Sequence, residues 1–296
     1  MKRYMVIYNP SSGKETAAQK IFGIAKRTLA VKDVEFTFYA TKKKGDATKA
    51  ARRACDNDYD LVISCGGDGT VNEVVNGIML SNKKSKLAIL PVGTINDFAQ
   101  QLNIPKGIIN FTKLLNVESF KKIDLGKAND KYFVNVVGGG AFTNIPHIVP
   151  SDVKTSFGKY AYYLQAAFEI PGQLDKSYNI KYTLDNKELE INTFLFLISN
   201  TSSVGGFKYL SPKAKCTDGL LDIMIIEKSS PADLLQIFTG ILNGQHVNHG
   251  KVHYFQSEKV IIQSDTNITL DIDGEVGDTT PVTVSSINQA IEILTP

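Results

Sequence analysis

The sequence predicts an N-terminal α/β domain with a parallel, doubly wound sheet, followed by an antiparallel β-sandwich domain. In the first third of the chain, four apolar strand-like runs are each followed by a turn and a helical pattern, as in a parallel sheet. In the second half, strand-like runs alternate with turn residues, which is typical of an antiparallel domain. A length of 296 residues also suits two domains, expected at 1–124 and 125–296.

The first domain is expected to contain strands at 5–8, 34–39, 61–64 and 87–90, each ending at a cluster of turn-forming residues. Helical patterns follow over 15–29, through Ala54, after Gly69 and over 105–116. The carboxyl ends of parallel strands meet at one edge of a sheet, where ligands bind. The four turns at 9–13, 41–46, 66–72 and 93–97 are therefore expected to meet there.

The second domain is expected to contain strands at 132–137, 180–184, 194–199, 221–226, 260–263 and 268–272. They alternate with turn residues such as Asp185-Asn186 and the stretch Asp271-Ile272-Asp273-Gly274. Helices are expected at 158–168 and 232–242. The last strand, about 288–296, fits either domain, so a return to the first domain stays open.

The composition is that of an ordinary folded protein, with 43% hydrophobic and 21% charged residues. A formal net charge of +3 gives no indication of nucleic acid binding, and it mildly favours anionic ligands and surfaces. Cys55, Cys65 and Cys216 lack zinc-like spacing, so free thiols in a reducing cytosol are expected. No stretch approaches the roughly 20 apolar residues of a membrane span. The expected location is cytoplasmic.

The most informative stretch is 61–77, in which a strand leads through Gly66-Gly67-Asp68-Gly69 into a helix. Glycines let the backbone approach an anion, and a helix N-terminus offers unpaired N–H groups. A carboxylate beside phosphate repels it unless a cation intervenes, so Asp68 indicates Mg²⁺. The alternative is a tight turn in which Asp68 caps the helix. Asp97, in the turn after the fourth strand, supplies a second carboxylate and strengthens the case for Mg²⁺.

These motifs resemble those of the diacylglycerol kinase catalytic-domain family, most closely its bacterial lipid kinases. The resemblance covers nearly the whole chain and rests on the stretches 9–13, 41–47, 66–77, 91–98, 157–164, 212–222 and 273–275. The glycine–aspartate motif alone is shared with NAD kinases and phosphofructokinases, whose N-terminal fold the first domain is expected to share. The Pro-x-Gly-Thr-x-Asn-Asp stretch at 91–97 and the Asp-Gly-Glu stretch at 273–275 narrow the resemblance to the lipid-kinase branch.

The resemblance implies an ATP- and Mg²⁺-dependent kinase that phosphorylates a lipid hydroxyl, with diacylglycerol as the first choice and phosphatidic acid as the product. Such an enzyme belongs to lipid metabolism and phospholipid biosynthesis. The residues implied to contact ATP are Asn9, Pro10, Ser11, Ser12, Gly13, Thr41, Gly66, Gly67, Asp68, Gly69, Thr70, Val71, Asn72 and Thr94.

The resemblance also implies a catalytic base and two metal sites. Glu275 is implied as the base that takes the proton from the lipid hydroxyl, and Asp68 and Asp97 as the residues that organise the catalytic Mg²⁺ through water. A structural Mg²⁺ is implied at the carbonyls of Lys215 and Leu220 and the carboxylate of Asp218.

The implied partners are ATP and a lipid alcohol presented by the inner face of a membrane, which the protein would contact peripherally. Family members are often dimers, so a homodimer is a further expectation, whereas nucleic acid is not expected as a partner. Lysines at 42–44, 83–84 and 121–122 are expected to be solvated. Near an anionic membrane each would contribute roughly 1 kcal/mol to binding.

The chain departs from the family pattern at two positions. Thr217 stands where the family often has an acidic residue, which weakens the charge of the structural metal site. Gln100 stands where the family commonly has arginine, which removes a contact for an anion.

Alternatives stay open on the residues alone. The stretch 273–275 also fits a plain hairpin turn. A soluble small-molecule kinase of the NAD type, or a non-catalytic ATP-binding sensor, would use the same nucleotide-binding turns.

Overall fold

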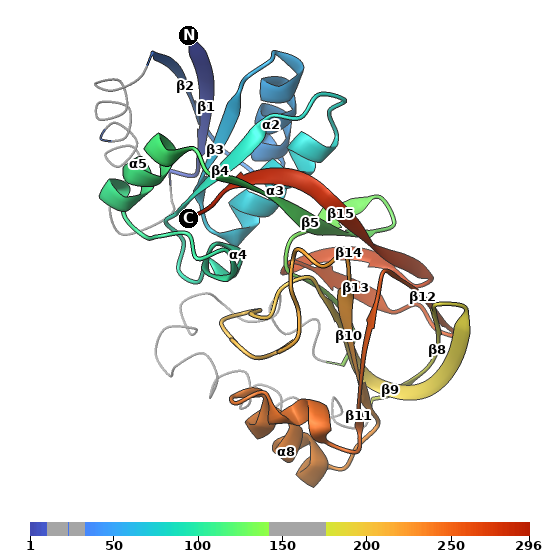
Figure 1. Cartoon of the computed structure of the whole chain (residues 1–296). Helices are drawn as coiled ribbons and strands as arrows, with labels where there is room; N and C mark the ends of the chain where they lie inside the picture. The colour runs from blue at the N-terminus through green and yellow to red at the C-terminus, as the bar shows by residue number, and fades with distance from the viewer. Residues whose placement is uncertain (11–22, 24–32, 142–175) are drawn as a thin grey trace. The chain divides into compact units, whose positions relative to one another are not determined.

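A computed structural model gives two compact units, Met1–Leu125 with Asn288–Pro296, and Gly126–Ile287 (Figure 1). The structure describes residues 1–10, 23, 33–141 and 176–296. The helices expected at 15–29 and 158–168 lie outside the described residues, apart from Gly23.

Unit 1 contains a parallel sheet with the strand order β2, β1, β3, β4. Its strands are β1 (Lys2–Tyr8), β2 (Val34–Ala40), β3 (Leu61–Gly66) and β4 (Lys86–Pro91). The end of β15 (Val282–Leu294) continues the sheet in parallel beside β4, with Ile293 opposite Leu87. Because β2 lies on one side of β1 and β3 on the other, the winding reverses between β1 and β3. The doubly wound sheet is confirmed, and its switch point is where ligands bind in such folds.

Helices cover both faces of this sheet. On one face, α5 (Ile108–Val117) packs Phe111 and Leu115 against Val6, Ile63 and Leu90. On the other, α2 (Asp46–Asp56) and α3 (Asp68–Met79) pack against β1, β3 and each other, and the short α4 (Asp97–Gln101) follows β4. Alternate strand residues thus point to two apolar layers, which explains why these strands read as continuous apolar runs.

Unit 2 is a β-sandwich whose two sheets share the 13-residue strand β9 (Lys187–Ser199). The first half of β9 pairs with β8 (Tyr178–Leu184), which continues through β12 (Lys259–Ser264) to β15. Its second half pairs with β7 (Val136–Gly140) and β10 (Leu221–Glu227). The second sheet extends through β13 (Thr269–Ile272) and β14 (Glu275–Thr279) on one side and β11 (Val252–Ser257) on the other.

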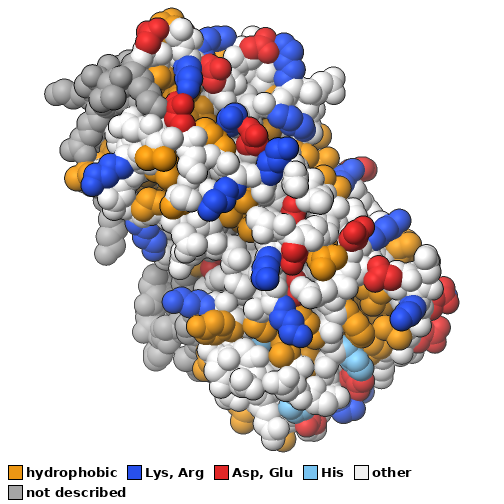
Figure 2. Space-filling model, in the orientation of Figure 1, with side chains coloured by type: hydrophobic (Ala, Val, Ile, Leu, Met, Phe, Trp, Pro, Cys, Tyr) orange, Lys and Arg blue, Asp and Glu red, His pale blue; other side chains and the backbone are white. Residues whose placement is uncertain are grey.

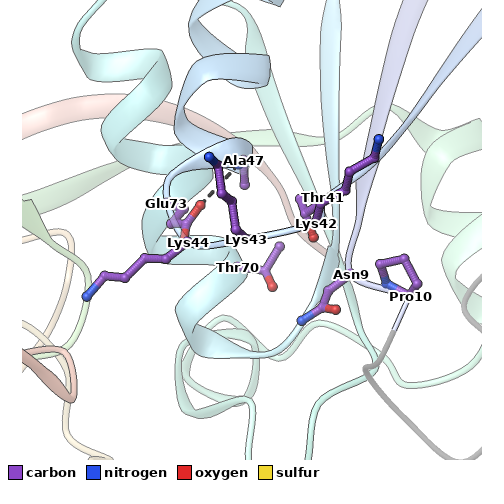
Figure 3. Close-up of a pocket in the computed structure, with 9 residues that line it drawn as sticks. All are labelled: Asn9, Pro10, Thr41, Lys42, Lys43, Lys44, Ala47, Thr70 and Glu73. Atoms are coloured by element: carbon purple, nitrogen blue, oxygen red, sulfur yellow. Dashed lines mark hydrogen bonds between the residues drawn. The ribbon is translucent and has the colours of Figure 1, made fainter.

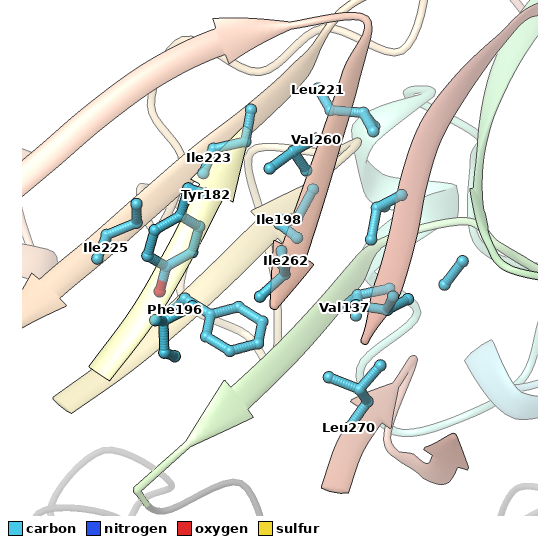
Figure 4. Packing of buried hydrophobic residues seen from close by; sticks show 14 of the residues in the cluster. Val137, Tyr182, Phe196, Ile198, Leu221, Ile223, Ile225, Val260, Ile262 and Leu270 are labelled. Atoms are coloured by element: carbon cyan, nitrogen blue, oxygen red, sulfur yellow. The ribbon is translucent and has the colours of Figure 1, made fainter. Parts of the chain in front are cut away.

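The core of unit 2 lies between these two sheets (Figure 4). Tyr182, Val260 and Ile262 from one sheet meet Phe196 and Ile223 from the other. The only hydroxyl among them is satisfied, because Tyr182 Oη lies 2.9 Å from Thr193 Oγ1. The outer face of β9, β10 and β11 packs against α8 (Pro231–Ile241), which is followed by the 3-10 helix η2 (Gln245–Asn248).

Several sequence predictions need correction. The single strand expected at 132–137 is two strands, β6 (Lys131–Phe133) and β7, because Val134 and Asn135 donate their amides to the Asp273 side chain instead of a strand. The helix expected at 105–116 begins only at Ile108. The pattern missed β5 (Phe120–Ala128), β11 and β14, and it detected only the end of β15. These strands are short, polar or interrupted by glycine, so their apolar periodicity is weak.

Replacing Phe196 with alanine should destabilise the protein strongly. Its ring is fully buried between the sheets, so truncation leaves a cavity and should cost about 3–5 kcal/mol in the free energy of unfolding. Urea denaturation followed by circular dichroism measures this loss. Val276→Ala, at a side chain that is 57% exposed, is the control and should change stability by less than about 0.5 kcal/mol. Equal effects of both changes would contradict the assigned core.

Candidate active site

Main-chain hydrogen bonds tie together the loops that follow the first four strands. Thr41 N donates to Tyr8 O at 2.9 Å, Asn9 N to Cys65 O at 3.2 Å, and Val92 N to Gly66 O at 3.1 Å. Each bond joins the end of one strand to the end of its neighbour in the sheet. The described parts of the turns expected to converge therefore lie along one continuous edge of unit 1, at the switch point between β1 and β3.

The two glycine-containing loops touch each other at this edge. A Cβ atom on Gly93 would lie 2.4 Å from Gly67 Cα, and one on Gly66 would lie 2.4 Å from Thr70 Oγ1. Asn96 fixes the second loop, because it has a positive φ of 59° and its amide bonds both the N–H and the C=O of Gly93. Glycine is thus required at Gly93, where backbone packs on backbone, and at Gly66, where backbone packs on the Thr70 side chain.

Two carboxylates lie in these loops. Asp68 is the first residue of α3, where the helix dipole favours negative charge, and its Oδ1 accepts a hydrogen bond from Phe98 N at 3.3 Å. Asp97 is the first residue of α4 and is 4% exposed. Burial and the nearby charge of Asp97 raise the pKa of Asp68, against the opposing effect of backbone hydrogen bonds from residues 96–98.

A divalent cation would relieve this repulsion. Among the described residues no cluster of three or more His, Cys, Asp or Glu side chains forms a complete metal cage. Mg²⁺ is usually held by one or two carboxylates together with substrate phosphates and water. Asp68 and Asp97 fit that donor set, so they are the residues that would hold such an ion.

A cavity of about 340 Å³ opens beside these loops (Figure 3). Its lining includes four residues that the resemblance implied for ATP: Asn9, Pro10, Thr41 and Thr70. It also includes residues that were not predicted as ligand contacts: Lys42, Lys43, Lys44, Ala47 and Glu73. Figure 3 shows the three lysine side chains pointing in different directions, whereas Asn9, Thr41 and Thr70 lie close together.

The lysine loop is held by two acidic side chains. Asp46 accepts hydrogen bonds from Lys42 N and Lys43 N, which hold the pKa of Asp46 below its ordinary value. Glu73 on α3 accepts from Gly45 N at 2.9 Å and Ala47 N at 3.0 Å, and so caps the N-terminus of α2. Glu73 lies on α3, five residues after Asp68, and no sequence pattern predicts that it caps α2.

The other residues implied for ATP have different environments. Gly69 has open space at its Cα, Thr94 is exposed, and Asn72 is partly exposed. Val71 is buried, and its N–H donates to Gly67 O within the first turn of α3. Ser11, Ser12 and Gly13 lie outside the described residues.

Glu275 lies in unit 2, at the start of β14. Asp273 and Gly274 both have positive φ, 51° and 85°, and connect the paired residues Ile272 and Glu275. The stretch is therefore a two-residue hairpin, as its spacing alone suggested. Glu275 follows the turn directly and is partly exposed. The hairpin and a chemical role for Glu275 are compatible.

Asp273 anchors this hairpin. Its carboxylate accepts hydrogen bonds from Val134 N at 2.7 Å, Asn135 N at 2.9 Å and Val136 N at 2.9 Å. Three bonds to one carboxylate join the hairpin to the connection between β6 and β7. The backbone that carries Glu275 is thereby fixed within unit 2.

The residues implied for a structural metal lie in the turn before β10. Asp218 Oδ1 accepts from Leu220 N at 3.1 Å, and Lys215 and Asp218 are exposed. A neighbouring acid was not predicted as a site residue: Asp222 is fully buried and accepts a hydrogen bond from Tyr254 Oη at 2.6 Å. In the sequence, the only indication of a role for Asp222 is its position at the end of the 212–222 motif.

The environment of Asp222 is unfavourable for its charge. Burial raises the pKa of Asp222 to about 6, with a smaller contribution from the charge of Asp218, while Tyr254, Gln256 and Lys213 act in the opposite direction. A cation at Asp218 would ease this charge pair, so the residues present fit the implied metal.

Comparisons with known proteins agree with this arrangement. The diacylglycerol kinase catalytic domain matches residues 3–128, and the YegS C-terminal NAD kinase beta sandwich-like domain matches residues 136–295. A diacylglycerol kinase of Staphylococcus epidermidis is 39% identical over 295 residues, which are 100% of this chain and 92% of the relative. The chain belongs to the diacylglycerol kinase family.

Further relatives support the assignment. A diacylglycerol kinase of Staphylococcus aureus is 38% identical over 100% of this chain and 93% of its own length. The crystal structure of a putative diacylglycerol kinase from Bacillus anthracis superposes with a TM-score of 0.86 at 27% identity, covering 100% of this chain and 95% of that one. The kinase assignment and both domain types are thereby confirmed.

Two surface properties bear on the partners of this kinase. On the face that Figure 2 shows, acidic and basic side chains are interspersed over the described residues, without an extended basic area. Within the described parts of the chain, no helix has the length and apolarity needed to cross a bilayer.

Gly93→Ala should destabilise the protein and weaken nucleotide binding together. The new methyl group meets backbone atoms of Gly67 that cannot rotate away, so a loss of about 1–3 kcal/mol is expected in urea denaturation. Gly69→Ala is the matched control for stability, because no atom lies within 4 Å of its Cβ position and it is helical. That variant should be as stable as the wild type or slightly more stable. Equal losses would show that the contact between the loops is unimportant.

Asp222→Asn should become more stable relative to the wild type as the pH rises. The folded pKa of Asp222, about 6, lies above the ordinary 3.8, so the stability that its protonation contributes is lost between about pH 4 and pH 6. The neutral amide escapes this loss, which amounts to about 2–3 kcal/mol. Urea titrations in EDTA at both ends of this range measure the difference. A pH-independent difference would contradict the buried charge.

Proposed function

We propose that this kinase transfers the γ-phosphoryl group of ATP to the free hydroxyl of diacylglycerol, giving phosphatidic acid and ADP. The observation that carries the proposal is the pair of touching glycine loops that hold Asp68 and Asp97 at the switch point of the sheet. The names of the Staphylococcus and Bacillus relatives support diacylglycerol as the acceptor.

The residues of unit 1 bind and orient the phosphates in this proposal. Phosphoryl transfer asks a protein mainly for positioning and charge neutralisation. Gly66, Gly67 and the N-terminus of α3 offer close backbone approach and a favourable dipole, while Asn9 and Thr41 line the adjoining cavity. Mg²⁺, held through Asp68 and Asp97, neutralises charge on the phosphates when bound.

Glu275 is the proposed general base. The lipid hydroxyl oxygen attacks the γ-phosphorus, the bond from that phosphorus to the oxygen of ADP breaks, and the hydroxyl proton passes to the Glu275 carboxylate. A carboxylate is ionised at neutral pH and can accept this proton. The hairpin and the three amide bonds of Asp273 give Glu275 a fixed backbone, as a positioned base requires.

Lys215, Asp218 and Leu220 are the proposed ligands of a structural Mg²⁺ in unit 2. The turn that contains them also holds Gly219 at a positive φ of 76°, which brings Asp218 and the amide of Leu220 together. Asp222 adds a negative charge near Asp218. This charge compensates for the one that is lost where Thr217 replaces an acidic residue.

Glu275→Gln and Asp68→Asn should each lower kcat by about 100-fold or more, because one removes the base and the other a metal-organising charge. Transfer of labelled γ-phosphate from ATP·Mg²⁺ to a panel of lipids in mixed micelles measures this. Glu258→Gln, at an exposed acid of unit 2, is the control and should keep full activity.

Each other outcome identifies an alternative. Transfer to a different lipid alone would keep the mechanism and change the substrate. Transfer to NAD or a sugar, with no need for lipid, would indicate a small-molecule kinase. Tight ATP binding with no transfer to any acceptor would indicate a sensor.

A further inference from the structure

The outward face of α8 carries no charge. Its exposed positions include Leu235, which is 49% exposed, and Leu242 at the C-cap, which is 54% exposed. These residues are seven apart and so share one side of the helix. Thr239 lies between them and is exposed, and its hydroxyl donates to Leu235 O at 2.9 Å. A surface helix normally presents charged residues on this side, so the face is unusual.

The helix holds this face rigidly. Its opposite side packs Leu234, Ile237 and Ile241 into an apolar cluster with β10 and β11. Its N-terminus is closed by a capping box, in which Ser230 and Asp233 bond each other's backbone. The exposed leucines are therefore not the product of a loosely packed helix.

The loop before β10 extends the same surface. A Cβ atom on Gly244, just after α8, would lie 3.5 Å from Tyr209 Cβ, and His246 Nε2 lies 2.9 Å from Leu210 O. Tyr209 is 49% exposed, and Lys208 beside it makes no ion pair with any described residue. We call Leu235, Leu242, Tyr209 and Lys208 the α8 face.

The loop that borders the α8 face is basic, and the one acid of α8, Asp233, is engaged in the capping box at the N-terminus of the helix. Residues 202–217 contain the three lysines Lys208, Lys213 and Lys215 and no acidic residue, and residues 234–250 contain no Asp, Glu, Lys or Arg. Exposed leucines and a tyrosine bordered by lysines match the boundary between the acyl chains and the headgroups of an anionic bilayer.

We propose that the α8 face docks the protein on an anionic lipid bilayer. The inference rests on the proposed function to the extent that a lipid kinase must reach a substrate held in a membrane. Leu235 and Leu242 would enter the acyl boundary, Tyr209 would lie at the headgroup level, and Lys208 would pair with lipid phosphates. A second protein copy is the competing occupant. Apolar contact would serve it equally well, but like-charged lysines on both copies would oppose it.

The test is co-sedimentation of the full chain with phosphatidylcholine vesicles, with and without phosphatidylglycerol, in EDTA and without ATP. Leu235→Glu combined with Leu242→Glu should weaken binding by about tenfold or more. The matched control is Leu80→Glu with Ile109→Glu, at leucine and isoleucine side chains of unit 1 that are 51% and 54% exposed. It should stay within about twofold of the wild type.

Charge is tested separately. Lys208→Gln should weaken binding to vesicles with phosphatidylglycerol by about fivefold and leave binding to pure phosphatidylcholine unchanged. Lys113→Gln, at an exposed lysine of α5, should change neither. Circular dichroism checks that each variant is folded.

The outcomes separate this inference from the proposed function. The α8 double variant should keep activity toward a short-chain diacylglycerol in detergent micelles while losing activity on vesicles. Undiminished vesicle binding by that variant would overturn the inference, and so would a wild-type dimer in sedimentation that the variant abolishes. If the wild type binds vesicles but phosphorylates no lipid, the proposed lipid substrate is wrong, and the docking inference is unaffected.

Discussion

The backbone contact between Gly67 and Gly93 is the constraint on which the candidate site depends. A side chain at Gly93 would collide with the main chain of Gly67, so the two main chains set the distance between the start of α3 and the start of α4. Asp68 and Asp97 are the first residues of those helices, and the contact therefore fixes the two carboxylates together with the backbone. A pair of acids held in this way repels itself and favours a cation. Packing and electrostatics are thus coupled at one point of the sheet.

In unit 2 the main constraint is the position of one polar residue, Glu275, at the edge of a sheet. The sandwich core is closed by apolar side chains from both sheets, and β9 serves both of them. At the end of β13 the Asp273 carboxylate binds three successive amides of another segment. A charge satisfied by backbone donors is stable where an isolated one would not be. These hydrogen bonds also fix the backbone of Glu275, which follows the turn.

Much of the architecture could be predicted from the sequence because its signals are local. The strands that precede Gly66 and Gly93 are apolar runs that end at turn residues, and parallel topology follows from their order. The residues that were missed depend on contacts distant in sequence. Glu73 acts on α2 through a fold that brings the two helices together, and Asp222 differs from an exposed acid only because Tyr254 and the surrounding strands bury it. The strands β11 and β14 escaped notice because their partners, not their own periodicity, define them.

Because Glu73 caps α2, the two ends of the candidate site differ in what they offer to an anion. Both α2 and α3 begin at this edge, yet the amides of Gly45 and Ala47 at the start of α2 are already bonded to a carboxylate. These two amides are therefore engaged, and an anion beside α2 meets the lysines that line the cavity instead. The edge therefore offers an anion two different environments: the carboxylates of Asp68 and Asp97 at the glycine loops, and three lysines in the cavity near Thr41 and Pro10. A polyanion on such an edge needs a bound cation at the glycine loops but not beside the lysines.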